Sequence, residues 1–420
     1  MTGRERVLTA LDHIEPDAVP IDLGGHRSSG IMAIAYARLK DYLGITSGGV
    51  YVYDLVQQLA IVEPEVQDLF GVDTIELGRG FAREDDYWTD WELPDGTLCK
   101  VPAHIPLGRE GDDWFIYNAA GVPIAVQKRG SLYFEQLVWP LLSARPGGDG
   151  GRDRFEDLEE RLDDIMWVAA ATPPAPLGFD AEDLAELRRG ALELRRSTDR
   201  AVIGLFGGNL VELGQFCFRM DTFLRMLAEA PARVHRFLDR LTDVHLRNLD
   251  VWLGAVGDCV DVVLFSDDLG MQTGPQLSPA MYDEFFKPRH ARMWARVKEL
   301  SEARVMLHCC GGIRPLLPSL IEAGMDTTNP VQTSCAGMEP AALKRDFGAR
   351  ITLWGGGCDT REVLPRGTPD EVSRHVRERM RVLSPGGGFV FQQVHNIMAD
   401  VPPQNVVAML EAAAEHRRLP

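Results

Sequence analysis

A histidine and two cysteines that follow a short apolar run are the clearest candidates for chemistry in this sequence. Residues 305–307 read Val-Met-Leu and predict a buried strand, and His308, Cys309 and Cys310 come directly after it. Because successive side chains of a strand point to opposite faces, His308 and Cys310 share one face and Cys309 points to the other. Zinc prefers imidazole and thiolate ligands, so His308 and Cys310 are predicted to be two ligands of a metal site.

A metal site needs a third ligand, and the sequence offers two candidates. His395 and Cys358 each come after a predicted strand, so each could face the same end of a sheet as His308 and Cys310. We favour His395 and keep Cys358 as the alternative third ligand, since the spacing alone barely separates them. Cys309 points away from its neighbours and is predicted to be structural.

Strands and helices alternate along most of the chain. Eight short apolar segments are predicted to be strands, and helical segments separate most of them: residues 19–23, 74–78, 201–206, 260–265, 304–309, 326–329, 351–354 and 388–392. This alternation favours an α/β fold, the (β/α)8 TIM-type barrel. The main alternative is an open doubly wound sheet, but no G-x-G-x-x-G sequence follows any of these segments.

Two regions interrupt this alternation. Residues 84–135 are rich in tryptophan and tyrosine and contain the turn pairs Asp95-Gly96 and Ala120-Gly121, which is typical of antiparallel hairpins. We interpret them as a small antiparallel β insertion in a single domain that spans residues 1–420. Residues 145–160 begin with a glycine-rich run and are predicted to form an exposed loop.

Polar residues gather at the downstream ends of five predicted strands, where a barrel of this kind has its active site. They are Asp267 and Asp268; His308 and Cys310; Asn329 and Gln332; Cys358 and Asp359; and Gln392, Gln393 and His395. One of the adjacent carboxylates, Asp267 or Asp268, is expected to face the pocket as a catalytic acid or base or as a substrate anchor. The competing interpretation is that such a carboxylate caps a helix or binds a backbone amide.

Substrate binding is assigned to four polar side chains near these strand ends: Gln272, Asn329, Gln332 and Asp359. Amides at such positions can hydrogen-bond a small polar substrate. The pair Asn329-Pro330 is equally typical of a turn, so this residue has two interpretations at this point.

Composition and charge exclude several classes of protein. The chain has 420 residues, of which 45% are hydrophobic, and this is enough for a large core. The formal net charge is −18 and there is no long basic run, so nucleic acid is not an expected partner. No secretory signal and no stretch of eighteen uncharged apolar residues are found, so no membrane association is expected. The seven cysteines, an odd number, favour reduced thiols in the cytoplasm.

Nearly the whole chain resembles the uroporphyrinogen decarboxylase superfamily. The segments that carry the resemblance are Arg4-Glu5-Arg6-Val7, Pro20-Ile21-Asp22-Leu23, Asp267-Asp268-Leu269-Gly270, Leu277-Ser278-Pro279-Ala280-Met281-Tyr282, Phe286-Lys287-Pro288, His308-Cys309-Cys310-Gly311, Gly357-Cys358-Asp359, Val394-His395-Asn396-Ile397 and Val401-Pro402-Pro403-Gln404-Asn405-Val406. The resemblance implies a (β/α)8 barrel. It leaves the reaction open, because the superfamily includes different chemistries.

One branch of the superfamily decarboxylates the acetate groups of a porphyrinogen without a cofactor. Its members bind the substrate carboxylates through an N-terminal arginine-glutamine-alanine-glycine-arginine motif. The corresponding stretch here, residues 23–30, reads L-G-G-H-R-S-S-G and contains one arginine, Arg27. Because several carboxylates need several guanidinium or amide donors, this departure argues against that activity.

The other branch consists of zinc-dependent methyltransferases that move a methyl group between a corrinoid protein and a thiol. The resemblance implies that they bind zinc through a histidine-x-cysteine pair and through a cysteine after the last strand. His308 and Cys310 match the pair, whereas His395 stands where the cysteine is expected. A site with two histidines and one cysteine carries less negative charge and is a stronger Lewis acid, which puts the thiol acceptor in doubt.

The sequence therefore predicts a zinc-dependent methyltransferase that acts on a small polar substrate. His308, Cys310 and His395 are expected to hold Zn²⁺. A corrinoid on a separate protein is a possible methyl partner, since this chain has no aspartate-x-histidine-x-x-glycine motif. A homodimer is also implied by the resemblance.

Two other classes stay open. A cofactor-independent decarboxylase would need carboxylate-binding arginines, and Arg27, Arg314 and Arg361 are the candidates. A non-enzymatic role would predict neither a metal nor a well-formed pocket.

Overall fold

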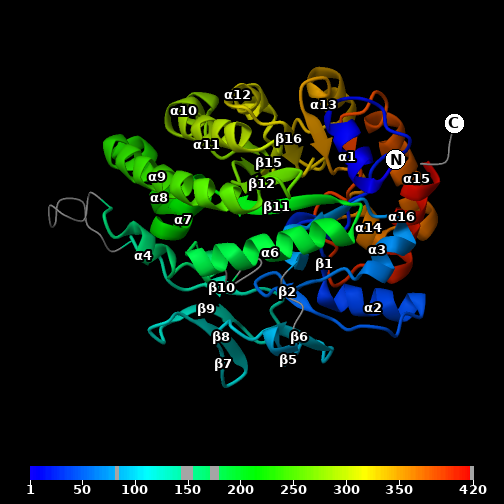
Figure 1. Cartoon of the computed structure of the whole chain (residues 1–420), viewed down its shortest axis with the longest axis horizontal. Helices are drawn as coiled ribbons and strands as arrows, with labels where there is room; N and C mark the ends of the chain where they lie inside the picture. Colours follow the sequence, from blue (N-terminus) through cyan, green and yellow to red (C-terminus); the bar gives the residue numbers. More distant parts are fainter. Residues whose placement is uncertain (81–84, 143–154, 171–178, 417–420) are drawn as a thin grey trace.

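A curled sheet of seven parallel strands forms the centre of the molecule (Figure 1). The computed structural model of the chain describes residues 1–80, 85–142, 155–170 and 179–416. The strand order is β18-β17-β16-β15-β12-β11-β4. The strands are β4 (Thr74–Glu76), β11 (Ala201–Gly207), β12 (Val262–Ser266), β15 (Arg304–His308), β16 (Thr327–Asn329), β17 (Thr352–Trp354) and β18 (Phe389–Val390). Seven of the eight predicted strands are therefore confirmed, as is the α/β class.

The eighth predicted strand, residues 19–23, forms only an isolated bridge between Ile21 and Phe391. It nevertheless contacts both edges of the sheet. The amide of Phe391, next to β18, donates to the carbonyl of Pro20 at 2.8 Å. The amide of Asp73, next to β4, donates to the carbonyl of Ile21, also at 2.8 Å. This segment thus satisfies backbone groups at both edges, which would otherwise stay unpaired.

Helices surround the sheet and carry the chain from one strand to the next (Figure 1). The longer ones are α1 (Gly3–Leu11), α2 (Ala33–Leu43), α6 (Ala181–Ser197), α8 (Met220–Glu229), α9 (Pro231–Val256), α11 (Lys287–Leu300), α15 (Pro369–Leu383) and α16 (Pro403–His416). The shorter ones are α3 (Pro64–Phe70), α4 (Leu158–Leu162), α5 (Met166–Ala170), α7 (Val211–Phe218), α10 (Pro279–Phe285), α12 (Leu317–Ala323), α13 (Pro340–Phe347) and α14 (Val363–Arg366). No helix among the described residues is long and apolar enough to cross a lipid bilayer.

Alternating side chains of the strands fill the interior of the curled sheet. Ala201 and Ile203 of β11 and Val262 and Leu264 of β12 belong to one buried cluster, as expected when every second side chain points inward. Val7 of α1 belongs to the same cluster. The N-terminal helix therefore packs against the inside of the sheet, and its start is fixed by a capping box formed by Thr2 and Glu5.

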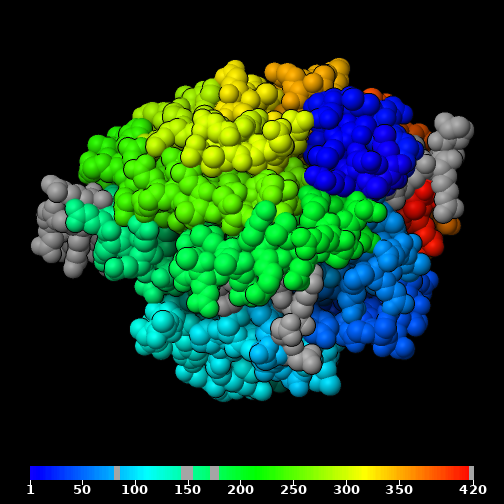
Figure 2. Space-filling model, in the orientation of Figure 1, coloured from blue at the N-terminus to red at the C-terminus, as the bar shows by residue number. Residues whose placement is uncertain are grey.

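Antiparallel strands follow β4, as the sequence predicts for residues 84–135. They are β5 (Trp88–Glu92), β6 (Leu98–Pro102), β7 (Leu107–Glu110), β8 (Asp113–Tyr117), β9 (Pro123–Gln127) and β10 (Glu135–Gln136). Trp91 of β5 and Trp114 of β8 meet edge to face with ring centroids 5.8 Å apart. These strands form the lower part of the molecule in the view of Figure 2, where they are coloured cyan. Two small sheets complete the fold. One has three strands in the order β1 (Ile31–Met32), β3 (Leu59–Ala60) and β2 (Val52–Asp54), and the other pairs β13 (Gly270–Met271) with β14 (Gly274–Pro275).

The predicted exposed loop at residues 145–160 needs a correction at its C-terminal end. Residues 145–154 lie outside the described residues. Phe155 is 1% exposed and packs edge to face on Phe237, and α4 begins at the buried residue Leu158. Because Phe155 is buried and α4 begins at Leu158, the exposed loop does not extend to residue 160. The glycine-rich run before Phe155 gave no sign of this burial.

Candidate functional site

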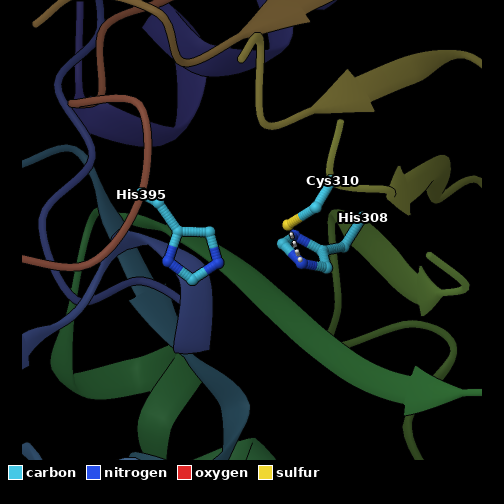
Figure 3. Close-up of side chains that lie close together, drawn as sticks. All are labelled: His308, Cys310 and His395. Atoms are coloured by element: carbon cyan, nitrogen blue, oxygen red, sulfur yellow. Dashed lines mark hydrogen bonds between the residues drawn. The ribbon is translucent and has the colours of Figure 1, made fainter. Parts of the chain in front are cut away.

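Three predicted metal ligands from two distant parts of the chain lie together at the C-terminal ends of the strands. His308 is the last residue of β15, Cys310 follows it, and His395 lies in the loop after β18. One potential ligand atom from each residue lies within 4.8 Å of the other two. Figure 3 shows His308 and Cys310 side by side, with His395 facing them from the opposite side. In the part of the chain that the structure describes, this is the single group of three such residues close enough to hold a metal ion.

The alternative third ligand is not part of this group. Cys358 is fully buried in the hydrophobic core, where its thiol lies 3.8 Å from the carbonyl of Asp359. Burial raises the pKa of this thiol well above its usual range. The structure therefore brings His395, and not Cys358, to His308 and Cys310.

The donor atoms suit a zinc ion. Zn–N bonds of about 2.0–2.1 Å and Zn–S bonds of about 2.3 Å place the ligands of a tetrahedral site roughly 3.3–3.8 Å apart. The sulfur of Cys310 lies 3.5 Å from Nε2 of His308, which fits this spacing. The ring centroids of His308 and His395 are 5.6 Å apart, and one ligand atom from each of the three residues lies within 4.8 Å of the other two.

Burial sets the protonation of these ligands. Burial and the nearby His308 lower the pKa of His395 to about 3, and burial also lowers the pKa of His308. Both imidazoles are consequently neutral near pH 7 and keep a lone pair for a cation. Burial and Asp268 raise the pKa of the Cys310 thiol well above its usual range. A thiolate at this position therefore needs a cation beside it.

Asn329, predicted to bind substrate, has its side-chain amide bonded to protein groups, among them the predicted metal ligand His308. Its side chain is fully buried, and its Oδ1 lies 2.9 Å from Nδ1 of His308. Its Nδ2 donates to the carbonyl of Trp354 and to Oε1 of Gln392, so the orientation of the amide follows from its partners. His308 must then donate from Nδ1, which leaves the lone pair on Nε2 free to face Cys310.

The first of the paired aspartates holds a helix. Asp267 is fully buried and accepts hydrogen bonds from the three backbone amides of residues 210–212, at 2.9–3.2 Å, where α7 begins. Its carboxylate also lies 3.2 Å from Nε2 of His290. These partners use its oxygens, so Asp267 corresponds to the second of the two interpretations, a carboxylate that binds backbone amides.

The second of the paired aspartates lies beside the predicted metal ligands. Oδ1 of Asp268 accepts a hydrogen bond from the amide of Cys310 at 2.7 Å and lies 3.9 Å from Nε2 of His308. Its side chain is 34% exposed, so it is open to a bound molecule. Asp268 is therefore the aspartate of the pair that lies beside the predicted metal ligands.

A glutamate that sequence reasoning missed lies next to these groups. Glu212 is in the first turn of α7, and its Oε2 accepts hydrogen bonds from Nδ2 of Asn209 at 2.6 Å and from Oγ of Ser266 at 3.2 Å. Burial, together with the charges of Asp268 and Asp267, raises its pKa well above the usual range. The shift favours the protonated form of Glu212 over its carboxylate. The available signal was its place shortly after the strand at residues 201–206, in a stretch otherwise read only as helix.

The remaining predicted substrate-binding residues differ in their surroundings. Gln332 is beside the site, because its Oε1 accepts a hydrogen bond from the amide of Gly311 at 2.6 Å. Oε1 of Gln272 is exposed and accepts from Arg361 at 3.0 Å. Oδ1 of Asp359 accepts from the three backbone amides of residues 361–363, where α14 begins. Gln332 is thus the one of these three that adjoins the predicted ligands.

Residues from the N-terminal part of the chain form a buried charged cluster. Arg27 lies 3.4 Å from Asp54, and Glu76, at the end of β4, is 3% exposed. Burial raises the pKa of Glu76 to about 6, and the positive charge of Arg27 only partly opposes this effect. Ionisation of Glu76 therefore costs folding free energy.

This cluster predicts a pH dependence of stability. The contribution of protonated Glu76 is fully present below the unfolded pKa of about 4.5 and is lost as the pH rises through about 6. The variant Glu76→Gln lacks this loss. Between pH 5 and 8 the wild type should therefore lose about 1 kcal/mol of unfolding free energy relative to the variant. Urea unfolding of both proteins at the two pH values measures the difference, and parallel pH profiles would contradict the prediction.

Comparison with known proteins shows the family of this chain. The model of the family uroporphyrinogen decarboxylase (URO-D) matches residues 193–416, which include His308, Cys310 and His395. The chain belongs to the URO-D family. A solved structure described as a methyltransferase from Methanosarcina mazei shares the fold, with a TM-score of 0.57 over 99% of each chain and 16% sequence identity.

Two curated relatives of this URO-D family member have different activities. The methylated-thiol–coenzyme M methyltransferase of Methanosarcina mazei is 27% identical over 164 residues, which is 38% of this chain and 39% of that protein. The chain thus matches about two fifths of the length of this relative. The uroporphyrinogen decarboxylase of Methylococcus capsulatus is 23% identical over 274 residues, which is 64% of this chain and 73% of that protein. Both relatives are enzymes.

Proposed function

We propose that this URO-D family member is a zinc-dependent methyltransferase. The observation that carries the proposal is the convergence of His308, Cys310 and His395, with both imidazoles neutral and Nε2 of His308 left free. The relationship to a methyltransferase supports it. The substrate is a small polar molecule that carries a methyl group on oxygen, nitrogen or sulfur, and a corrinoid on a separate protein is the methyl partner.

The roles of the residues follow from their positions. His308, Cys310 and His395 would hold zinc, which when bound supplies Lewis acidity at the heteroatom of the substrate. Gln332, beside Gly311, would orient the substrate. Gln272 and Asp359 are weaker candidates for this role, because a side-chain oxygen of each already accepts a hydrogen bond from the protein.

The proton balance involves the two carboxyl groups. Transfer of the methyl group breaks the bond between the methyl carbon and the heteroatom and forms a bond from that carbon to the nucleophilic acceptor. The heteroatom then takes up a proton. Asp268 is placed to deliver it, and Glu212, whose raised pKa favours the protonated form and whose charge interacts with that of Asp268, is the proposed source. Transfer in the opposite direction uses the same groups in reverse.

A decarboxylase is the second candidate, because the relative from Methylococcus capsulatus matches the longer part of the chain. The arginines favour it less. Arg27 lies 3.4 Å from Asp54, and Arg314 is paired with Asp346. Two of the three candidate carboxylate ligands are thus already neutralised by carboxylates of the protein.

Methyl transfer to free cob(I)alamin tests the proposal. The purified protein is supplied with zinc and with methyl thioethers, aryl methyl ethers or quaternary methylamines, and methylation of the corrinoid is followed by its absorbance. We expect at least one donor class to react, and removal of the metal to stop the reaction. Metal-independent release of carbon dioxide from uroporphyrinogen, without methyl transfer from any donor, would favour the decarboxylase instead.

A further inference from the structure

The loop that carries His395 is tied to a segment near the N-terminus. Gly30 donates its backbone amide to Oδ1 of Asn396 at 3.0 Å, and its carbonyl accepts from the amide of Ile397 at 3.0 Å. Nε2 of Gln393 donates to the same carbonyl at 3.4 Å. Hydrogen bonds to Gly30 therefore hold the chain on both sides of His395.

The same segment also contacts the residue that orients His308. Oγ of Ser28 donates to Oδ1 of Asn329 at 2.6 Å, and this oxygen is the one that accepts from His308. Residues 28–30 therefore hydrogen-bond both to Asn329, the partner of His308, and to the residues that flank His395. The two histidines themselves come from different strand ends.

One side chain joins these two sets of contacts. Gln392 lies three residues before His395 and is fully buried. Its Oε1 accepts from Nδ2 of Asn329 at 2.8 Å, and its Nε2 donates to the carbonyl of Ser28, also at 2.8 Å. It uses an acceptor toward one partner and a donor toward the other. A primary amide supplies the acceptor and the donor from two different atoms, as these two bonds require.

A buried carboxylate, Asp22, binds the segment of residues 28–30. Asp22 accepts hydrogen bonds from Oγ of Ser29 at 3.0 Å, from Oγ1 of Thr74 at 2.7 Å and from Nε1 of Trp354 at 2.8 Å. The side chain of Asp22 is fully buried, so these charge-assisted bonds lie away from water. These bonds fix the position of residues 28–30, which in turn bind Asn329 and Asn396.

We propose that Gln392 is a positioning residue that sets the separation of the ligands His308 and His395. It binds the beginning of the loop that carries His395 to Asn329, and Asn329 orients the ring of His308. This inference rests on the proposed metal site. Partners of metal ligands of this kind typically change metal affinity about 10–100-fold when they are removed.

The test compares Gln392→Met with a matched control. Methionine keeps the length of the side chain and removes both hydrogen bonds. The control Gln127→Met removes a similarly buried amide in the β insertion, where Nε2 of Gln127 donates to the carbonyl of Ser131. Zinc affinity is measured by competition with a chelator, and ligand geometry by the absorption spectrum of the cobalt(II)-substituted proteins. Urea unfolding reports the stability of each variant.

We expect Gln392→Met to weaken zinc binding about tenfold or more and to change the cobalt spectrum. Gln127→Met should leave both as in the wild type, although it also loses a buried amide. If Gln392→Met does not fold, Ser28→Ala takes its place, with a smaller weakening of zinc binding expected because it removes only one donor to Asn329.

The outcomes separate this inference from the proposed function. If the wild type binds zinc and the folded Gln392 or Ser28 variants bind it equally well with unchanged cobalt spectra, the positioning role is wrong and the metal site stands. If the wild type itself binds neither metal, the proposed function falls and this inference falls with it.

Discussion

Replacement of His308 by alanine is expected to abolish zinc binding. The variant keeps only two of the three protein ligands, and Nε2 of His308 is the atom that faces Cys310. We expect about one zinc ion per chain in the wild type and none in His308→Ala after dialysis against a weak chelator. Metal analysis of the purified proteins measures this directly, and methyl transfer should be lost in parallel.

Two further variants separate the candidate third ligands. His395→Ala should lose zinc as His308→Ala does, whereas Cys358→Ala should keep it, because Cys358 lies outside the group of ligands. Equal zinc contents in the wild type and His308→Ala would refute the proposed site. Loss of zinc in Cys358→Ala alone would show that the third ligand was assigned to the wrong residue.

Replacement of Asp268 by asparagine is expected to reduce the rate of methyl transfer about 10²–10⁴-fold while zinc stays bound. Asparagine has the same shape and can still accept the hydrogen bond from the amide of Cys310, but it cannot transfer a proton. The measurement is kcat at saturating substrate, together with the zinc content of the same sample.

The control for this variant is Asp180→Asn. Asp180 also accepts hydrogen bonds from backbone amides, at the start of α6, and asparagine serves equally well at such a position. Its rate should equal that of the wild type. A wild-type rate in Asp268→Asn would remove Asp268 from the mechanism and leave Glu212 as the remaining carboxyl group of the site.

The parallel sheet could be predicted because buried strands leave a local signal. Short apolar runs such as those of β11, β12 and β15 are recognisable without any knowledge of their neighbours. Residues 19–23 carry a weaker pattern, and the structure gives them one bridge and a few backbone hydrogen bonds instead of a full strand. Phe155 was missed because its burial depends on Phe218 and Phe237, which lie far away in sequence.

The roles of individual polar residues were harder to predict than their positions. Asp267 and Asp268 are adjacent, so the sequence could say that they point apart but not which one faces the site. The first turn of α7 decides which aspartate faces the site, because the backbone amides there donate hydrogen bonds to Asp267. The sequence likewise predicted Asn329 as a substrate-binding amide. In the structure its side-chain oxygen is bonded to His308 and its side-chain nitrogen to Gln392.

The sequence by itself determined the pair His308 and Cys310, because the two-residue period of a strand places them on one face whatever surrounds them. Only the tertiary structure decided that His395 joins them and that Cys358 does not. Both residues follow a strand, so both meet the local requirement equally. The difference lies in tertiary packing, which buries Cys358 in the hydrophobic core and ties the loop of His395 to Gly30, and no local pattern in the sequence encodes such contacts.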